Sequence, residues 1–159
     1  MILRPLERKD IEQFYDNEKE IFGSYESWSF KICENEILNK DRYYVGIFKD
    51  DELIAWGGIS LFMDSDLMTI AVKNNYRRMG YCSKILDNII GKAMEKKLRN
   101  IFLEVRENNI NAIRLYEKHG FHKISIRKNY YKNPLENAII MKKNINDIGV
   151  IGSEILDKI

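Results

Sequence analysis

The stretch IAVKNNYRRMGYCS, from Ile70 to Ser83, carries the strongest structural signal in the chain. It opens with an apolar strand and continues into a short loop that holds Arg77, Arg78 and Gly80. A helix of about five turns is predicted directly afterwards, because apolar residues recur there at helical spacing. These residues are Cys82, Ile85, Leu86, Ile89, Ile90, Ala93 and Met94.

Two interpretations of this loop remain open from the residues alone. The first N–H groups of a helix have no partner within the helix and carry partial positive charge, so they bind phosphate oxygens. Gly80 would let the backbone come close to a pyrophosphate. The alternative is a basic loop ahead of a surface helix. The GxGxxG pattern of dinucleotide-binding folds is absent.

Outward from this segment, strands and helices mix in the order β-α-α-β-β-β-α-β-α-β-β. Before it, we expect a strand over 2–6, a helix capped by Asp10, a helix over 29–38, an antiparallel hairpin (43–48 and 53–62), a turn at Asp64–Asp66 and a strand over 67–72. After it, we expect a strand over 101–105, a helix capped by Asn108 or Asn109 and ended by Gly120, and strands over 121–127 and 138–141. The central antiparallel pairing excludes a doubly wound dinucleotide fold.

Length and composition bound the class of protein. The 159 residues suit one domain, and 45% hydrophobic residues can bury a core. Lys and Arg total 26 against 24 Asp and Glu, a balance that argues against direct nucleic-acid binding. Two cysteines provide neither a disulfide framework nor a metal cluster, so we expect no metal. The early charges exclude a signal peptide and no apolar run could span a membrane, so we expect a cytoplasmic protein.

A second informative stretch is LEVRENNINAIRLYEKHGF, from Leu103 to Phe121. Glu104 interrupts an apolar strand and points to the face opposite its neighbours. It lies either on a solvated face or in a cleft, where a carboxylate serves as a general base. Tyr116 falls on the apolar stripe of the following helix, which also fits a core tyrosine whose hydroxyl needs a partner.

Together these segments resemble the GCN5-related N-acetyltransferase (GNAT) superfamily. Arg77-x-x-Gly80-x-Cys82 is similar to its acetyl-CoA pyrophosphate loop, although the family prefers Gly or Ala where this chain has Cys82. Asn109-x-x-Ala112-x-x-Leu115-Tyr116-x-x-x-Gly120-Phe121 is similar to its later coenzyme segment. The resemblance implies a GNAT fold of the α/β (α+β) class, with a mixed, mostly antiparallel sheet flanked by helices and a splay between the fourth and fifth strands.

The stretch 103–121, with IRKNYY, ENAIIM and Trp28-Ser29, is similar to the bacterial ribosomal-protein-alanine N-acetyltransferase (RimI-type) subfamily. The resemblance covers about residues 2–143. It implies a GNAT domain over 1–143, with 144–159 as a C-terminal appendage that ends in a possible helix over 150–159. The implied reaction moves acetyl from acetyl-CoA to the N-terminal alanine of a small-subunit ribosomal protein. The alternatives are acetylation of a small amine or a lysine side chain, and a non-catalytic acyl-CoA-binding module.

The resemblance also implies roles for individual residues. Glu104 matches the general base, Tyr116 the general acid, and the Val72 N–H would stabilise the oxyanion. Cys82 is a rival nucleophile, disfavoured because no histidine adjoins it. Tyr130 and Tyr131, expected in the loop before the last strand, would hold the acceptor peptide with Trp28; packing on the sheet is their other interpretation. The implied coenzyme contacts are Ile70, Ala71, Val72, Arg77, Arg78, Gly80, Cys82, Ser83 and Asn109.

The run from Lys118 to Lys132 holds five Lys/Arg, two His and no acid. A solvated basic face is the usual interpretation of such a run. It could also help the protein to meet ribosomal material, or receive the 3′-phosphate of coenzyme A.

Overall fold

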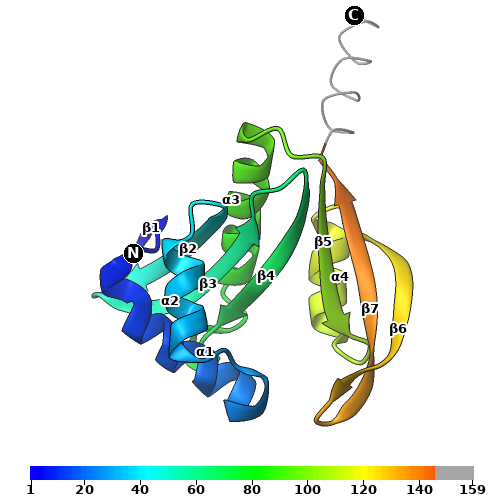
Figure 1. Cartoon of the computed structure of the whole chain (residues 1–159), viewed down its shortest axis with the longest axis horizontal. Coiled ribbons are helices and arrows are strands. Elements are labelled where there is room, and N and C mark those ends of the chain that lie inside the picture. Colours follow the sequence, from blue (N-terminus) through cyan, green and yellow to red (C-terminus); the bar gives the residue numbers. More distant parts are fainter. Residues whose placement is uncertain (146–159) are drawn as a thin grey trace, which may run out of the picture. The chain divides into compact units, whose positions relative to one another are not determined.

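The computed structural model describes residues 1–145. The predicted appendage over 144–159, with its possible helix, therefore lies outside the described residues except for Asn144 and Ile145. The helices and strands follow the predicted order (Figure 1). They are β1 (Ile2–Pro5), a 3₁₀ turn (Arg8–Asp10), α1 (Ile11–Glu26), α2 (Phe30–Leu38), β2 (Arg42–Lys49), β3 (Glu52–Ser60), β4 (Asp64–Val72), a 3₁₀ turn (Asn74–Tyr76), α3 (Tyr81–Glu95), β5 (Asn100–Arg106), α4 (Ile110–Lys118), β6 (His122–Lys132) and β7 (Leu135–Asn144).

The chain forms two compact units. Unit 1 consists of Met1–Ser60 and Met68–Ile89, and unit 2 consists of Leu61–Leu67 and the chain from Ile90 onward. The hydrogen-bonded strand order is β1-β2-β3-β4-β5-β7-β6, and β4 contributes to both units. As expected, the sheet is mixed and mostly antiparallel; its parallel pair is β4–β5.

Helices cover both faces of the sheet in unit 1. Phe14 of α1 is fully buried and meets the Tyr44 ring edge-on, with 5.6 Å between centroids. It shares a core cluster with Trp56 of β3. The next residue, Gly57, faces the opposite way, and a Cβ there would meet Ile85 of α3. Because neighbouring strand residues point to opposite faces, α1 and α3 pack on opposite sides of β3.

Polar side chains fix α1 to the strands beneath it. The backbone N–H of Leu53 donates to Gln13 Oε1 at 2.6 Å, and Asn17 Nδ2 donates to the Leu53 carbonyl at 2.9 Å. At the next residue of α1, the buried Glu18 carboxylate accepts from Thr69 of β4 at 3.2 Å. The helix is thereby positioned on β3 and β4 by hydrogen bonds as well as by its apolar stripe.

Unit 2 is built on β5, β7 and β6. Seven antiparallel pairs join β5 to β7, from Asn100↔Asn144 to Arg106↔Ala138, and β6 pairs with the other side of β7. On β5 the expected alternation holds: Ile101, Leu103 and Val105 are buried while Glu104 faces the other way. The parallel ladder to β4 joins Asp64–Asp66 to the first three residues of β5.

The end of α4 depends on a glycine. Gly120 has a φ of +94°, the left-handed conformation predicted for the residue after a helix. A Cβ at this position would meet the Nζ atom of Lys143 on β7. Lys143 is itself buried, and burial lowers the pKa of its ammonium.

In the first half of the chain, one predicted turn is wrong and one predicted helix cap holds only in its position. Asp64–Asp66 is the start of β4 rather than a turn, because Ser65 is buried and the three residues pair with β5. Asp10 occupies the N-cap position of α1, as predicted, but its side chain makes no capping hydrogen bond to that helix. Its carboxylate instead accepts from the Glu7 N–H at 2.7 Å and from Arg4 at 2.8 Å. Those partners precede it in the chain, so its oxygens stabilise the 3₁₀ turn.

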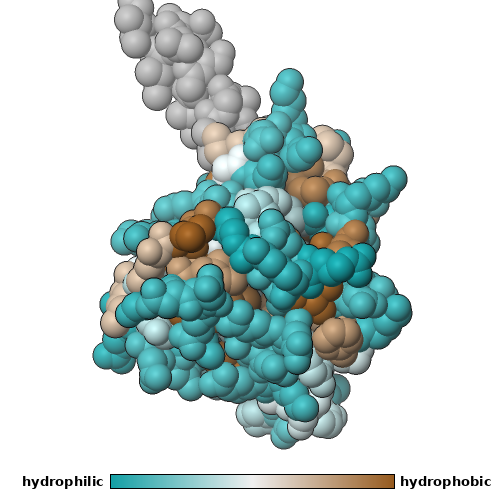
Figure 2. All heavy atoms as spheres, turned by 90° about the vertical axis from the view of Figure 1, so that its left-hand side faces the viewer, coloured by the Kyte–Doolittle hydropathy of each residue, from teal (hydrophilic) through white to brown (hydrophobic). Residues whose placement is uncertain are grey.

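The surface of unit 1 carries separate apolar areas. Exposed apolar side chains occur on β1, at Ile2 and Leu3, and on α2, at Phe30 and Ile32. Figure 2 shows one face of the molecule, on which several hydrophobic areas are set in a mostly hydrophilic surface. No helix of the part that the structure describes is long and apolar enough to cross a membrane.

Candidate active site

The loop between β4 and α3 is exposed and basic, and part of its backbone is left-handed. Arg78 and Gly80 both adopt left-handed conformations, with φ of +63° and +82°. Arg77, Arg78 and Gly80 are exposed, and a Cβ built on Gly80 would meet nothing within 4 Å. The Gly80 carbonyl accepts the first helical hydrogen bond, from Lys84 at 3.1 Å. The N–H groups of the first helical turn therefore begin directly beyond an open, positively charged loop.

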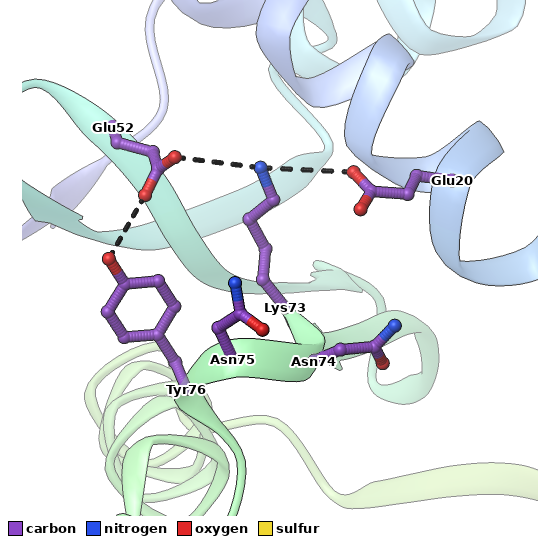
Figure 3. A pocket seen from close by; sticks show the side chains of 6 residues that line it. All are labelled: Glu20, Glu52, Lys73, Asn74, Asn75 and Tyr76. Carbon is purple, nitrogen blue, oxygen red and sulfur yellow. Dashed lines mark hydrogen bonds and ion pairs between the residues drawn. The ribbon is translucent and has the colours of Figure 1, made fainter.

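The first half of this loop is anchored to unit 1. Lys73 reaches Glu20 of α1 at 3.8 Å and Glu52 of β3 at 3.7 Å, and the Tyr76 hydroxyl donates to Glu52 at 3.2 Å (Figure 3). The Lys73 N–H also donates to the Ile54 carbonyl at 2.9 Å. These contacts border a polar cavity of about 310 Å³, lined by Glu20, Glu52, Lys73, Asn74, Asn75 and Tyr76. The anchor leaves Arg77–Gly80 as the exposed part of the loop.

The predicted coenzyme contacts on β4 lie directly before this loop. On β4, Ile70 is half-buried and Ala71 packs into the core cluster of unit 1, while Val72 lies at the limit of burial. The Arg77 Nε donates to the Val72 carbonyl at 3.4 Å, which folds the arginine back toward the strand. Cys82 and Ser83 follow in the first turn of α3 and are half-buried.

Cys82 lacks the properties of a nucleophile. Burial raises the pKa of its thiol to about 11, so almost none of it is thiolate at neutral pH. The thiolate is the form that attacks a thioester. This agrees with the sequence-based expectation that Cys82 is disfavoured as the nucleophile.

In unit 2, Glu104 lies on the exposed face of β5. Its side chain is 32% exposed, and its Oε1 pairs with Arg127 NH1 of β6 at 3.1 Å. The Tyr130 hydroxyl also hydrogen-bonds the Glu104 carboxylate, which raises the pKa of that phenol. The sequence left a solvated face and a cleft as alternatives for Glu104. Within unit 2, Glu104 lies on a solvated face, and two residues of β6 hold its carboxylate.

The two other predicted residues of this segment lie on α4. Asn109, rather than Asn108, is the N-cap, and its Oδ1 accepts from the Ala112 N–H at 3.2 Å. Tyr116 is buried at 6% exposure and meets the Phe121 ring at 5.9 Å between centroids. Its ring thus packs as the core interpretation expects, a placement that is also compatible with a role for its hydroxyl.

The predicted acceptor-binding residues fall in different settings. Tyr130 and Tyr131 lie within β6 rather than in a loop, because β6 continues to Lys132 and turns at Asn133 and Pro134. Their rings meet edge-on at 5.0 Å between centroids. Trp28, in unit 1, is half-buried and lies 6.4 Å from the Phe14 ring.

Sequence reasoning missed two arginines beside these tyrosines. Arg127 pairs with Glu104, and Arg106 lies over the Tyr131 ring at 4.2 Å while pairing with Glu136 at 3.1 Å. Glu136 in turn accepts from the Asn108 N–H at 2.7 Å, so it connects β7 to the start of α4. The only available signal was the basic run that contains Arg127, which does not indicate a partner. Within residues 1–145, no group of His, Cys, Asp and Glu could hold a metal ion.

Comparison with known proteins identifies the family. Residues 7–121, with the loop at Arg77–Ser83 among them, match the acetyltransferase (GNAT) family. The chain belongs to that family. A relative from Bacillus subtilis (strain 168) is 35% identical over 91% of this chain and 96% of its own length. The ribosomal protein bS18-alanine N-acetyltransferase of Haemophilus influenzae is 32% identical over 88% of this chain and 96% of its own.

A solved structure agrees with this assignment. The crystal structure of the ribosomal-protein-S18-alanine N-acetyltransferase from Escherichia coli aligns with a TM-score of 0.82. It is 28% identical and covers 91% of this GNAT chain and 93% of its own. The resemblance to the RimI-type subfamily is thereby confirmed, and the chain is an acetyltransferase.

Proposed function

We propose that this GNAT protein transfers the acetyl group of acetyl-CoA to the α-amine at a protein N-terminus, with the N-terminal alanine of ribosomal protein bS18 as its acceptor. The observation that carries the first part is the open basic loop at the start of α3, with Arg78 and Gly80 in left-handed conformations. The acceptor is supported by the names of the bS18-alanine N-acetyltransferases that resemble this chain over most of its length.

On the coenzyme side, the pyrophosphate would bind over Arg77–Ser83. The arginines supply positive charge, and the first N–H groups of α3 supply hydrogen-bond donors. The open space at Gly80 permits a close approach of phosphate oxygens to the backbone. Ile70, Ala71 and Val72 would pair with the pantetheine arm through the backbone, as an added strand does. Asn109 keeps its amide NH₂ for the coenzyme, since its Oδ1 serves as the helix cap.

In the proposed reaction the acceptor amine attacks the thioester carbonyl directly, without an acyl-enzyme. A protein α-amine has a pKa of about 8, so a carboxylate acting through a water is a sufficient base, and Glu104 takes this role. The Val72 N–H would stabilise the oxyanion that develops on the carbonyl. The new amide bond forms as the carbon–sulfur bond breaks, and the Tyr116 hydroxyl protonates the leaving coenzyme A thiolate.

On the acceptor side, we assign Trp28, Tyr130 and Tyr131 to binding the peptide. Tyr130 and Tyr131 are partly exposed on the same hairpin as Arg127, and the Tyr130 hydroxyl contacts Glu104. Trp28 is half-buried and presents part of its ring at the α1–α2 junction.

The deciding experiment incubates the protein with acetyl-CoA and short peptides that differ in their first residue. Each peptide carries an internal lysine and is supplied with a free and with a blocked N-terminus, and products are analysed by mass and fragmentation. We expect the free alanine peptide to gain one acetyl group at its α-amine and the blocked peptide to gain none. Acetylation of the internal lysine in blocked peptides would instead indicate a lysine acetyltransferase. Acetyl-CoA binding without any product would indicate a binding module.

A further inference from the structure

Arg127 reaches Glu104 across an intervening strand. Glu104 pairs with Ile140 of β7, and Arg127 pairs with Ala138 of the same strand, two residues away. Residues paired across a sheet share a face, so both side chains lie on the face that Ala138 shares. Two strand spacings separate β5 from β6, about 10 Å, which only a long side chain can cross. The methyl group of Ala138 leaves room for that crossing.

An irregularity in β6 brings Tyr130 to the same carboxylate. Residues three apart on a regular strand point to opposite faces, so Arg127 and Tyr130 would normally diverge. The β6–β7 register shifts between Arg127 and Tyr131, and Asn129 has a φ of +54° within this bulge. The Asn129 N–H donates to Asn137 Oδ1 at 2.9 Å, which holds the bulge in place. The bulge resets the alternation, and both side chains reach Glu104.

The ion pair between Arg127 and Glu104 contributes little to the stability of the fold. Arg127 is 59% exposed and Glu104 is 32% exposed, and ion pairs at such positions are weak because water screens them. The neighbouring Arg106 is engaged elsewhere, with Glu136 and the Tyr131 ring. A pair that adds little stability, yet spans two strand spacings over a small residue, is better explained by what it does to the Glu104 carboxylate.

We propose that Arg127 is a positioning residue, which holds the Glu104 carboxylate in the orientation from which it accepts the acceptor's proton. The inference rests on the proposed function, in which Glu104 is the base. Because the pair is partly exposed, the carboxylate held by Arg127 can still accept a hydrogen bond from the water through which the acceptor's proton moves. Arg127 thus acts through Glu104 and takes no part in coenzyme binding.

A double-mutant cycle tests this proposal. Arg127→Met should lower kcat by about three- to ten-fold and leave the KM for acetyl-CoA unchanged. Arg127→Lys, which keeps the positive charge, should retain at least part of the activity that Arg127→Met loses. In a Glu104→Gln background, Arg127→Met should cause no further fall, because the two residues act as one unit. Lys128→Met removes the same charge from the next position on β6 and serves as the control, with unchanged kcat. Independent, multiplicative losses in the cycle would overturn the proposal.

A second measurement is independent of activity. Tyr130 is titrated by its ultraviolet absorbance, comparing each variant with its Tyr130→Phe counterpart. Glu104 raises the pKa of Tyr130 and Arg127 lowers it, so Glu104→Gln should lower that pKa and Arg127→Met should raise it. A Tyr130 titration that neither change affects would refute the cluster. If the wild-type protein transfers no acetyl group, the proposed function fails, and the titration still decides whether Arg127 and Tyr130 hold Glu104.

Discussion

Glu18 of α1 accepts a hydrogen bond from Thr69 of β4 through a carboxylate that is almost wholly buried. The side-chain oxygens are 3.2 Å apart, and Glu18 is 2% exposed. Burial raises the pKa of Glu18 from its ordinary value of 4.5 to about 7. Thr69 directly precedes the segment proposed to pair with the pantetheine arm. The protein therefore keeps a titratable group behind its coenzyme strand.

Glu18 should make the stability of the protein depend on pH. Between pH 4.5 and 7 the folded protein retains a proton that the unfolded chain has lost, so the free energy of unfolding falls as pH rises through this window. The loss is about 3 kcal/mol, and it is complete above the folded pKa. Glu18→Gln should remove this slope, as measured by urea unfolding at a series of pH values. Glu12→Gln, on the exposed side of the same helix, is the control; parallel curves for wild type and Glu18→Gln would contradict the prediction.

Gly80→Glu should abolish acetyl-CoA binding. A carboxylate there occupies the space proposed for phosphate oxygens and repels them, measurable by calorimetric titration with acetyl-CoA. Gly80→Ala introduces the same strain at a positive φ without the charge, so it separates the two effects and should retain weakened binding. Gly91→Glu, on an exposed turn of α3, should bind as wild type does. Normal affinity in a folded Gly80→Glu protein would move the pyrophosphate elsewhere.

Glu104→Gln should preserve the fold and acetyl-CoA affinity but lower turnover by about 10²–10⁴-fold, the usual contribution of a general base. The deficit should shrink as pH rises above the amine pKa of about 8, because the acceptor then arrives without its extra proton. Steady-state rates across this pH range test both statements. If wild type and Glu104→Gln are equally active at neutral pH, Glu104 is only a surface residue of β5.

Tyr116→Phe separates chemistry from packing. The ring contact with Phe121 persists, so a purely structural tyrosine predicts near-normal turnover and a loss of about 1 kcal/mol from one hydrogen bond. A general acid predicts slow turnover with normal coenzyme affinity. Loss of the general acid should lower turnover less for acyl donors with a more acidic thiol, because their thiolate leaves readily without a proton. An equal penalty for every donor would indicate a misplaced substrate.

The sequence predicted the elements whose signal is local. The apolar spacing of α3 and the asparagine cap of α4 are set by residues within a few positions of one another. Asp64–Asp66 was misjudged because acidic residues favour turns, whereas here pairing with β5, more than thirty residues later, makes them a strand. Tyr130 and Tyr131 were misplaced because β6 extends by pairing with β7, which the local pattern does not record.

The arrangement around Glu104 could not be predicted for a related reason. Its partner Arg127 is 23 positions away, and the two meet because β7 lies between β5 and β6 and both residues pair on the same face of β7. Resemblance to relatives supplied the candidate base, but a motif names residues without their contacts. The order of the strands decides which side chains become neighbours on one face of the sheet.

The end of the Lys143 side chain fills the space that a side chain at position 120 would need, and this links the evolution of the two positions. Any side chain at 120 would press on the Lys143 ammonium, so the buried end of the lysine side chain would have to move aside. A shorter residue at 143 would release that constraint, and position 120 would then be limited only by its positive φ. Across related sequences, the two positions should therefore change together, with non-glycine residues at 120 accompanied by a short side chain at 143.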